Sequence, residues 1–233
     1  MKINIPKFAI LVAGGSGSRM NAVIPKQFIL LDNKPILVHT IERFLECKLE
    51  QIVLALPEKD IAYWETQVVP NFESIQDALS KTKLLIVKGG DTRYQSVRSG
   101  ILALGKIDGL VAIHDGVRPF VSAQLIEKSF EIATQKGSAV LAVDSKDSVR
   151  ILDENGMNKH IDRSKVKLIQ TPQTFDLEMI YSAFELGEQP HFTDDASVFE
   201  FAGHSVTLME GSYENIKITT PEDLFIAQEI LQK

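Results

Sequence analysis

The segment 8–20 reads FAILVAGGSGSRM, an apolar run followed at once by a glycine-rich loop. The run 8–13 is rich in Val, Ile and Leu without alternation, which is typical of a strand buried on both faces of a parallel sheet. Glycines let the backbone turn sharply and bring N–H groups against an anion with no Cβ in the way. Open α/β sheets bind ligands at the carboxyl ends of such strands. The stretch therefore predicts an α/β fold with an anion site at its first turn.

Further short apolar runs alternate with segments of helical spacing. After Pro35, which suits a first helical turn, apolar residues share one face; Ser122 and Thr220-Pro221 are typical helix starts. Alternating strands and helices predict a doubly wound, mostly parallel sheet. The other predicted strands are 52–56, 84–87, 110–113 and 139–143.

The stretch 144–170 breaks this rhythm because it is polar and charged. A β-prone piece at 148–152 leads into Asp153-Glu154-Asn155-Gly156, and the Asn-Gly pair favours a hairpin. We interpret 144–170 as an extended β-hairpin arm that packs against a second subunit, giving a homodimer; a mobile surface loop is the alternative. No interdomain linker interrupts 1–233, which predicts a single domain carrying this arm.

Bulk composition limits the function classes. The chain has 233 residues, 44% apolar and 24% charged, and a formal charge of −6, which argues against a nucleic-acid partner because such binding needs a basic face. Cys47 is the only cysteine, so no disulfide can form within the chain. No run of about 18 apolar residues predicts a membrane span, and residues 1–6 lack the apolar core of a signal peptide. A cytoplasmic location is the expectation.

The glycine-rich loop does not fit three better-known motifs. A Walker loop needs Gly-Lys-Ser/Thr at its end, where Gly17 is followed by Ser18-Arg19. A dinucleotide fingerprint from Gly15 fails at Met20, and a nucleophile elbow on Ser16 fails at Ser18. What is left is a phosphate loop followed by two cations, Arg19 and Lys26.

A family resemblance rests on eight blocks spread in order over nearly the whole chain. Together they resemble the 2-C-methyl-D-erythritol 4-phosphate cytidylyltransferases and their relatives, the ribitol-5-phosphate cytidylyltransferases. This implies a Rossmann-like nucleotidyltransferase fold. The blocks are Gly14-x-x-Gly17-x-Arg19-Met20, Pro25-Lys26-Gln27, Gly89-Gly90-Asp91-x-Arg93-x-x-Ser96-Val97, His114-Asp115-Gly116-Val117-Arg118-Pro119, Asp162-Arg163, Gln170-Thr171-Pro172-Gln173, Thr193-Asp194-Asp195-Ala196-Ser197 and Asn215-Ile216-Lys217.

The resemblance implies attack by a phosphate oxygen of the acceptor on the α-phosphorus of CTP, without a protein nucleophile. We expect Arg19, Lys26 and Lys217 to converge on the triphosphate, because such catalysis depends on positioning and positive charge. One Mg²⁺ would be held mainly by phosphates, with Asp115 as a candidate ligand. The residues expected to bind the nucleotide are Ala13, Gly14, Gly15, Gly17, Gly90, Asp91, Ser96 and Asp115.

Five further residues are expected to bind the acceptor, a sugar-alcohol phosphate: Arg118, Ser148, Arg163, Thr171 and Thr193. In the family, the counterparts of Ser148 and Arg163 reach across a dimer interface to grip the acceptor's phosphate. Either threonine could instead serve in a turn or cap.

His114, Asp194 and Asp195 are kept out of the predicted site, whereas Asp91 stays in it with a second possible role. His114 is expected to pack in the interior, since the chemistry needs no strong base. Asp194 and Asp195 are expected to start a helix, where carboxylates favour its dipole. Asp91 could cap a helix as well as bind the base.

The predicted activity is transfer of CMP from CTP to 2-C-methyl-D-erythritol 4-phosphate, with release of pyrophosphate. Two departures from the pattern, Val12-Ala13-Gly14-Gly15 with Ser18 and the arm residue Ser148, keep a ribitol-5-phosphate cytidylyltransferase as the alternative. A nucleotide-binding protein on the same scaffold that has lost turnover is the rival from another class.

Overall fold

The computed structural model describes residues 5–14 and 24–232, and their main sheet has seven strands in the order β11-β7-β10-β6-β1-β4-β5. All neighbours pair in parallel except β10, which runs antiparallel to both β6 and β7. The predicted α/β, mostly parallel fold is therefore confirmed. The strands are β1 (Lys7–Val12), β4 (Gln51–Leu56), β5 (Leu84–Lys88), β6 (Leu110–Asp115), β7 (Ser138–Asp144), β10 (Lys167–Asp176) and β11 (Leu208–Glu210).

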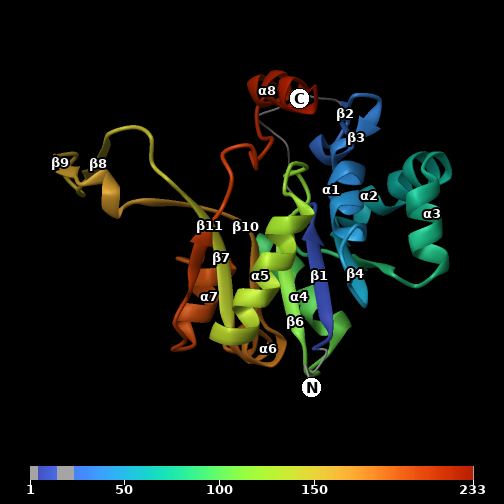
Figure 1. Cartoon of the computed structure of the whole chain (residues 1–233), viewed down its shortest axis with the longest axis horizontal. Helices are drawn as coiled ribbons and strands as arrows, with labels where there is room; N and C mark the ends of the chain where they lie inside the picture. The colour runs from blue at the N-terminus through green and yellow to red at the C-terminus, as the bar shows by residue number, and fades with distance from the viewer. Residues whose placement is uncertain (1–4, 15–23, 233) are drawn as a thin grey trace.

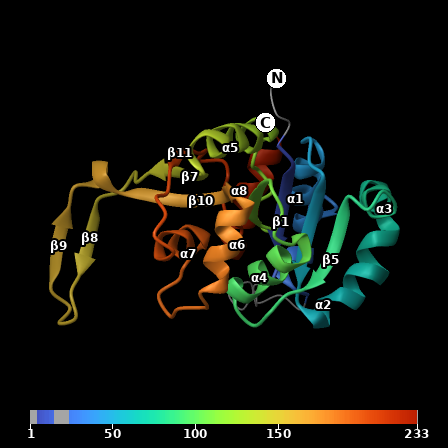
Figure 2. The same ribbon diagram turned by 90° about the horizontal axis from the view of Figure 1, so that it is seen from below.

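Helices cover both faces of this sheet (Figures 1 and 2). Alternate residues of β1 show why: Ala9 and Leu11 pack in a cluster with α1 and α5, whereas Phe8 and Ile10 pack against α4, α6 and α7. Both faces are therefore dry, as continuous apolar strands require. The helices are α1 (Ile36–Leu45), α2 (Glu58–Tyr63), α3 (Glu73–Ser80), α4 (Arg93–Leu104), α5 (Ala123–Lys136), α6 (Leu177–Glu185), α7 (Asp195–Phe201) and α8 (Pro221–Leu231).

The order of strands explains where a ligand can bind. From β1 the chain first moves outward to β4 and β5, and only then returns to place β6 on the other side of β1. This reversal leaves a crevice at the carboxyl ends of β1 and β6, where open α/β sheets bind ligands. A small hairpin of β2 (Leu30–Leu31) and β3 (Lys34–Pro35) lies beside α8 at this end of the molecule (Figure 1).

The arm is a separate two-stranded hairpin, β8 (Val149–Leu152) and β9 (Asn158–Ile161), extending away from the body (Figure 1). The predicted turn closes it: Gly156 has φ +77° and donates its N–H to the Asp153 carbonyl at 3.0 Å. Strand β10 already begins at Lys167, so 167–170 belong to the main sheet and the free arm is 145–166. We call 145–166 the arm from here on.

Local predictions mostly match. Ser122 caps α5, and Thr220 with Asp223 forms a capping box at α8. Two were wrong: Pro35 lies just before α1, and α4 is capped by Thr92, whose side chain accepts from the Gln95 N–H, not by Asp91. Strand β10, with its cis Thr171–Pro172 bond, was not foreseen. No helix in the described part of the chain is long and apolar enough to cross a membrane.

Candidate functional site

A cavity of about 480 Å³ lies in the crevice at the carboxyl ends of β1 and β6. It brings together residues from five of the eight sequence blocks. Gly15, Gly17 and Arg19 lie outside the described residues. The predicted residues that line the cavity are Ala13, Gly14, Lys26, Gly90, Asp91, Ser96, Asp115 and Lys217, together with unpredicted neighbours such as Gln27, Lys59 and Arg93.

One wall is the turn between β5 and α4, which carries Gly90 and Asp91, two of the residues expected to bind the nucleotide. Ser96, buried to 2% exposure, accepts a hydrogen bond from the Gly90 N–H at 3.2 Å. Gln95 accepts from the Asp91 N–H at 3.0 Å, and its Cβ would lie 2.3 Å from any Cβ at position 90. Glycine is therefore required at 90, and Asp91 remains exposed at the cavity rim. Two side chains of α4 therefore hold the backbone of this turn in place.

Lys26 enters the cavity from a short 3-10 helix, Lys26–Phe28, that follows Pro25. The residue is 8% exposed, and its neighbour Gln27 donates to the Asp60 carboxylate of α2 at 2.9 Å. A lysine this buried is rare unless it is partnered, and Lys26 has interactions within the chain. Lys26 is therefore a buried cation in the wall of the cavity, not a solvated surface charge.

Asp115, the last residue of β6, is the carboxylate at the centre of the site. Its Oδ1 receives Arg93 Nε at 3.3 Å, and its Oδ2 receives Lys217 Nζ at 2.9 Å and Arg118 Nε at 3.4 Å. Burial alone would raise the pKa of Asp115, but these three cations hold it well below its ordinary value. The carboxylate is therefore ionised at neutral pH, and it gathers positive charge at this point.

Arg93 and Asp195 were not placed in the predicted site, yet they form a bidentate ion pair there. The two terminal nitrogens of Arg93 donate to the two carboxylate oxygens of Asp195 at 2.8 and 2.7 Å. Burial raises the pKa of the Asp195 carboxyl, and the Arg93 charge opposes that rise. Asp194 caps α7, as expected for that pair of residues. Because Asp194 alone caps α7, the adjacent Asp195 is not needed for capping. The two consecutive aspartates were therefore the sequence signal that one of them has another role.

A second cavity of about 230 Å³ adjoins the first and shares Arg93, Asp115 and Lys217 with it. Three of the predicted acceptor-binding residues, Arg118, Thr171 and Thr193, line it. Arg118 is held by a bond from Nη1 to the Asn215 carbonyl at 2.9 Å, and the Asn215 amide donates to the Thr171 carbonyl at 2.8 Å. The loop 211–217 therefore orients both Arg118 and Lys217.

Thr171 uses its hydroxyl inside the protein. The oxygen accepts from the Asp115 N–H at 3.1 Å and lies 3.0 Å from His114 Nδ1. His114 is fully buried, packs on Phe44, and its Nε2 lies 3.1 Å from the Arg118 carbonyl. Burial lowers the pKa of His114 to about 4, so the ring is neutral at pH 7. The packing role predicted for His114 agrees with this, and Thr171 orients Asp115.

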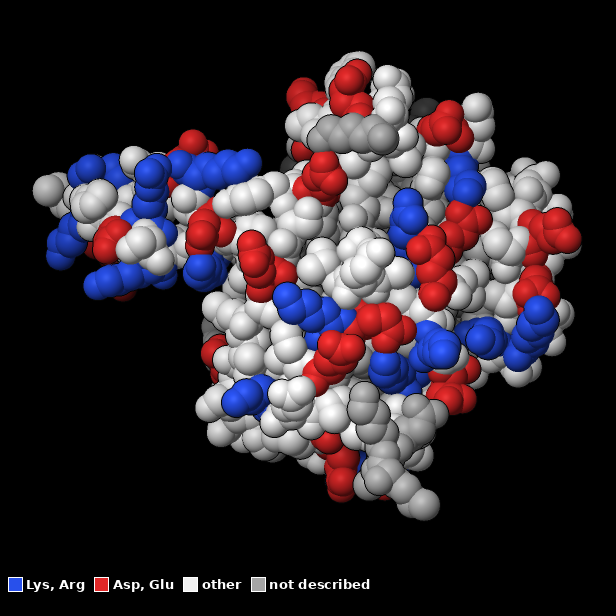
Figure 3. All heavy atoms as spheres, in the orientation of Figure 1, with Lys and Arg blue, Asp and Glu red and all other residues white. Residues whose placement is uncertain are grey.

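Ser148 and Arg163 are exposed on the arm, and neither lines the cavities of the body. Arg163 Nη1 donates to the Lys146 carbonyl at 2.9 Å, which folds the arm's root. The space-filling view shows Lys and Arg side chains gathered over the arm (Figure 3). Within one chain, these two residues are not brought to the other predicted acceptor-binding residues.

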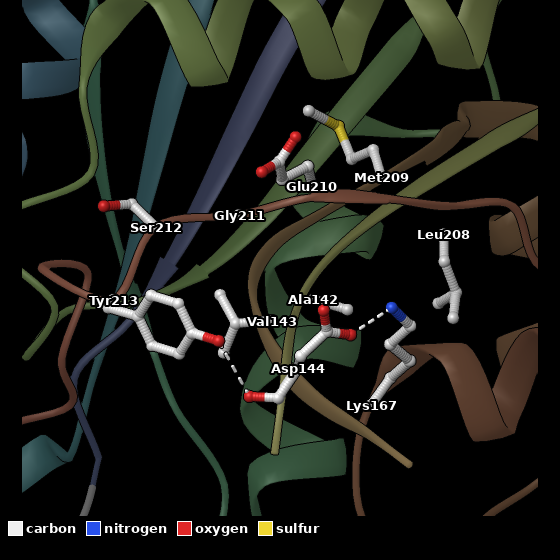
Figure 4. A pocket seen from close by; sticks show the side chains of 10 residues that line it. All are labelled: Ala142, Val143, Asp144, Lys167, Leu208, Met209, Glu210, Gly211, Ser212 and Tyr213. Carbon is white, nitrogen blue, oxygen red and sulfur yellow. Dashed lines mark hydrogen bonds and ion pairs between the residues drawn. The ribbon is translucent and has the colours of Figure 1, made fainter. Parts of the chain in front are cut away.

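A third cavity, of about 550 Å³, lies at the root of the arm (Figure 4). Tyr213 donates to the Asp144 carbonyl at 3.1 Å, and Lys167 pairs with the Asp144 carboxylate. It is larger than the other two, but its one cation, Lys167, is already paired with Asp144, and none of the predicted residues lines it. Convergent polar groups, not volume, identify the site.

Together the two adjoining cavities can hold two anions side by side. Lys26 faces the first, Arg118 the second, and Lys217 and Arg93 face both. Nothing in 5–14 and 24–232 groups three or more His, Cys, Asp or Glu into a metal cage. The geometry suits phosphoryl transfer that relies on charge and positioning.

A family model described as IspD: 2-C-methyl-D-erythritol 4-phosphate cytidylyltransferase matches residues 8–233. Relatives named 2-C-methyl-D-erythritol 4-phosphate cytidylyltransferase include one from Bacteroides thetaiotaomicron, 42% identical over 95% of this chain and 98% of the relative. Another, from Clostridium botulinum, is 41% identical over 97% of this chain and 99% of the relative.

Solved structures agree in fold over almost the entire chain. The 4-diphosphocytidyl-2C-methyl-D-erythritol synthase from Anaerococcus prevotii has a TM-score of 0.82 and 31% identity, covering 98% of this chain and 97% of its own. The Francisella tularensis 2-C-methyl-D-erythritol 4-phosphate cytidylyltransferase has a TM-score of 0.78 and 29% identity, covering 96% and 99%.

Proposed function

The chain belongs to the 2-C-methyl-D-erythritol 4-phosphate cytidylyltransferase family, and on that premise we propose that it transfers CMP from CTP to 2-C-methyl-D-erythritol 4-phosphate and releases pyrophosphate. It is a nucleotidyltransferase, and the ribitol-5-phosphate alternative is not favoured by relatives named for the methylerythritol enzyme. The observation that carries the proposal is the wall of Arg93, Asp115 and Lys217 that two adjoining cavities share.

Each cavity has a distinct task in this reaction. CTP occupies the first, with its base against the turn 89–92 and its phosphates toward Lys26 and Lys217. The acceptor occupies the second, where Arg118 faces its polar groups. An acceptor phosphate oxygen then attacks the α-phosphorus in line, and the negative charge that grows on the phosphoryl oxygens is met by lysines already in place. Arg19 is proposed to join them.

Mg²⁺ is proposed as the cofactor, and Asp115 is the one residue proposed as its protein ligand. Mg²⁺ binds to phosphate oxygens and one or two carboxylates, keeping much of its water. Asp115 supplies one ionised carboxylate at the junction of the cavities, although its oxygens also serve Lys217, Arg93 and Arg118. When bound, the ion would neutralise phosphate charge and orient the triphosphate. Asp115 would be the protein's contribution.

The arm is proposed to complete the acceptor site in a homodimer, with Ser148 and Arg163 of each chain serving the other chain's cavity. Arg163 supports this proposal because a planar guanidinium suits bidentate phosphate binding. Exposed Ile151 (56%), Leu152 (68%) and Met157 (67%) on the hairpin also support burial against another surface. A cytoplasmic location completes the proposal.

The activity is tested by measuring pyrophosphate release with CTP and Mg²⁺, comparing 2-C-methyl-D-erythritol 4-phosphate, ribitol 5-phosphate and no acceptor. We expect release with the first acceptor alone. Preference for ribitol 5-phosphate would replace the proposed acceptor. Release with neither would remove the proposed activity.

Composite sites are tested by complementation. Lys26→Ala damages the cavity and Arg163→Ala damages the arm, so each homodimer should be weak. After subunit exchange, every heterodimer has one site with both defects and one intact site, and random mixing should restore about a quarter of wild-type activity. Activity that stays at the level of the separate variants, despite exchange confirmed by mass spectrometry, would contradict shared sites.

A further inference from the structure

Asp195 is a buried charge that the proposed reaction does not itself use. Its side chain is 1% exposed, and both of its oxygens are bound by Arg93 at 2.7 and 2.8 Å. Helix α7 does not need it as a cap, because Asp194 and Ser197 already form a capping box there. Burying a carboxylate is costly unless it is paired. We therefore look for the role of Asp195 in its ion pair with Arg93.

That partner has a fixed geometry. Arg93 begins α4 and lines both cavities, and its guanidinium is planar with its donors in a rigid fork. When Asp195 holds the two terminal nitrogens, the third donor, Nε, has one direction left. It points at Asp115 Oδ1, 3.3 Å away.

The position of the Asp115 carboxylate in turn determines where the cations that line the two cavities can bind it. Arg93 takes Oδ1, so Lys217 and Arg118 share Oδ2 at 2.9 and 3.4 Å. If Arg93 turned away, Oδ1 would become free to draw Lys217 or Arg118 out of its present position. Lys217 is the less enclosed of the two, with 39% of its side chain exposed against 12% for Arg118.

We propose that Asp195 is a positioning residue: acting through Arg93, it orients the Asp115 carboxylate and so holds Lys217 at the junction of the nucleotide and acceptor cavities. This inference rests on the proposed function. The competing explanation is that the Arg93–Asp195 pair only ties α4 to α7. The two explanations differ in whether Asp195 matters once Asp115 has lost its charge.

The test is a cycle of four proteins: wild type, Asp195→Asn, Asp115→Asn and the double variant. Asparagine keeps the shape of the side chain but gives up one acceptor and the charge. We expect Asp195→Asn to lower kcat about 10- to 30-fold and to change KM for CTP less than about threefold, because Asp195 does not line the CTP cavity. In the Asp115→Asn background the same substitution should change kcat less than about threefold.

Stability must be separated from positioning, because breaking a buried pair also destabilises a fold. Each variant is therefore assayed at a temperature where circular dichroism shows it folded. Tyr94→Phe is the matched control: it removes another buried tie of α4, the Tyr94 hydroxyl to the Phe184 carbonyl at 2.7 Å. It should lower the midpoint of thermal unfolding and leave kcat within about twofold.

Two results would overturn the inference. One is an equal loss of kcat from Asp195→Asn in both backgrounds, and the other is an unchanged kcat with a lower unfolding midpoint. Both leave the proposed function standing, because wild type turns over in the same assay. A wild type that releases no pyrophosphate would overturn the function and this inference together.

Discussion

The cavity at β1 and β6 and the arm 145–166 both hold residues that the sequence assigned to the substrates, but they differ in how those residues are held. In the cavity, Lys26, Ser96 and Asp115 are buried, at 8%, 2% and 6% exposed, and Ser96 and Asp115 are also held by hydrogen bonds. On the arm, Ser148 and Arg163 lie in solvent. The cavity residues are held inside one chain, whereas the two arm residues are exposed and lie apart from the other predicted acceptor-binding residues.

The charges of the two regions differ as well. The arm carries five Lys or Arg and four Asp or Glu, in a chain whose formal charge is −6. The arm is thus positive relative to the acidic body, which suits a phosphate-gripping element (Figure 3). In the cavity, the positive side chains of Arg93, Arg118 and Lys217 instead form ion pairs with one carboxylate, Asp115. These pairs hold the cations in position in the absence of substrates.

The largest effect is expected in the cavity. Lys26→Ala should lower turnover about 10²- to 10³-fold, as loss of one preorganised charge at a transition state does. Steady-state pyrophosphate release measures this. Lys81→Ala, which removes an exposed ammonium paired with Asp77 on α3, is the control and should turn over normally. Near-normal turnover of Lys26→Ala would refute its assignment.

On the arm, Arg163→Ala should raise KM for the acceptor about 10- to 100-fold, because charge-assisted bonds to phosphate are lost. KM for CTP should change little, since the CTP cavity is built without the arm. Titrating each substrate at saturating levels of the other separates the two constants. Lys159→Ala, on the same hairpin, serves as the control. A rise in KM for CTP alone would contradict the division between the regions.

His114 makes the buried region sensitive to pH. Its pKa is about 4 in the folded chain against 6.5 when exposed, so the unfolded state takes up the proton first as pH falls. The free energy of unfolding should be highest above pH 6.5 and should fall by about 2 kcal/mol between pH 7 and pH 5 because of this residue. Urea unfolding of wild type and His114→Gln at both pH values measures the difference.

His160→Gln, on the exposed arm, is the matched control for this pH experiment. It should leave the fall in stability as in wild type. If His114→Gln showed the full wild-type slope, the buried neutral ring would not be its source.

The smallest effect compares two caps. Thr92→Ala removes the N-cap of α4, a helix of the core, and should cost about 1 kcal/mol of unfolding free energy. Asp162→Ala removes a similar bond to the Ser164 N–H on the arm and should not change global unfolding measurably. Chemical denaturation compares them. Equal costs would mean that the arm unfolds cooperatively with the body.

Secondary structure that depends on a few consecutive residues was predictable from the sequence. Apolar runs predicted strands β1, β4, β5, β6 and β7, and the Asn155-Gly156 pair predicted the hairpin. The two errors, Pro35 and the cap at Asp91, are shifts of one residue at helix starts; at α4 the adjacent polar residues Asp91 and Thr92 could each have served as the cap. Strand β10 was missed because Pro172 and polar neighbours hide its periodicity.

The sequence by itself determined the class of fold, the family and most of the residues around the cavity, because backbone propensity and short motifs are encoded within a few positions. Only the tertiary structure decided that Asp195 binds Arg93, 102 positions earlier, and that Arg93 binds Asp115. It also turned the Thr171 hydroxyl inward to the Asp115 N–H. The physical reason is that these contacts depend on which strands become neighbours and which helix ends meet over them, and no local pattern records that choice.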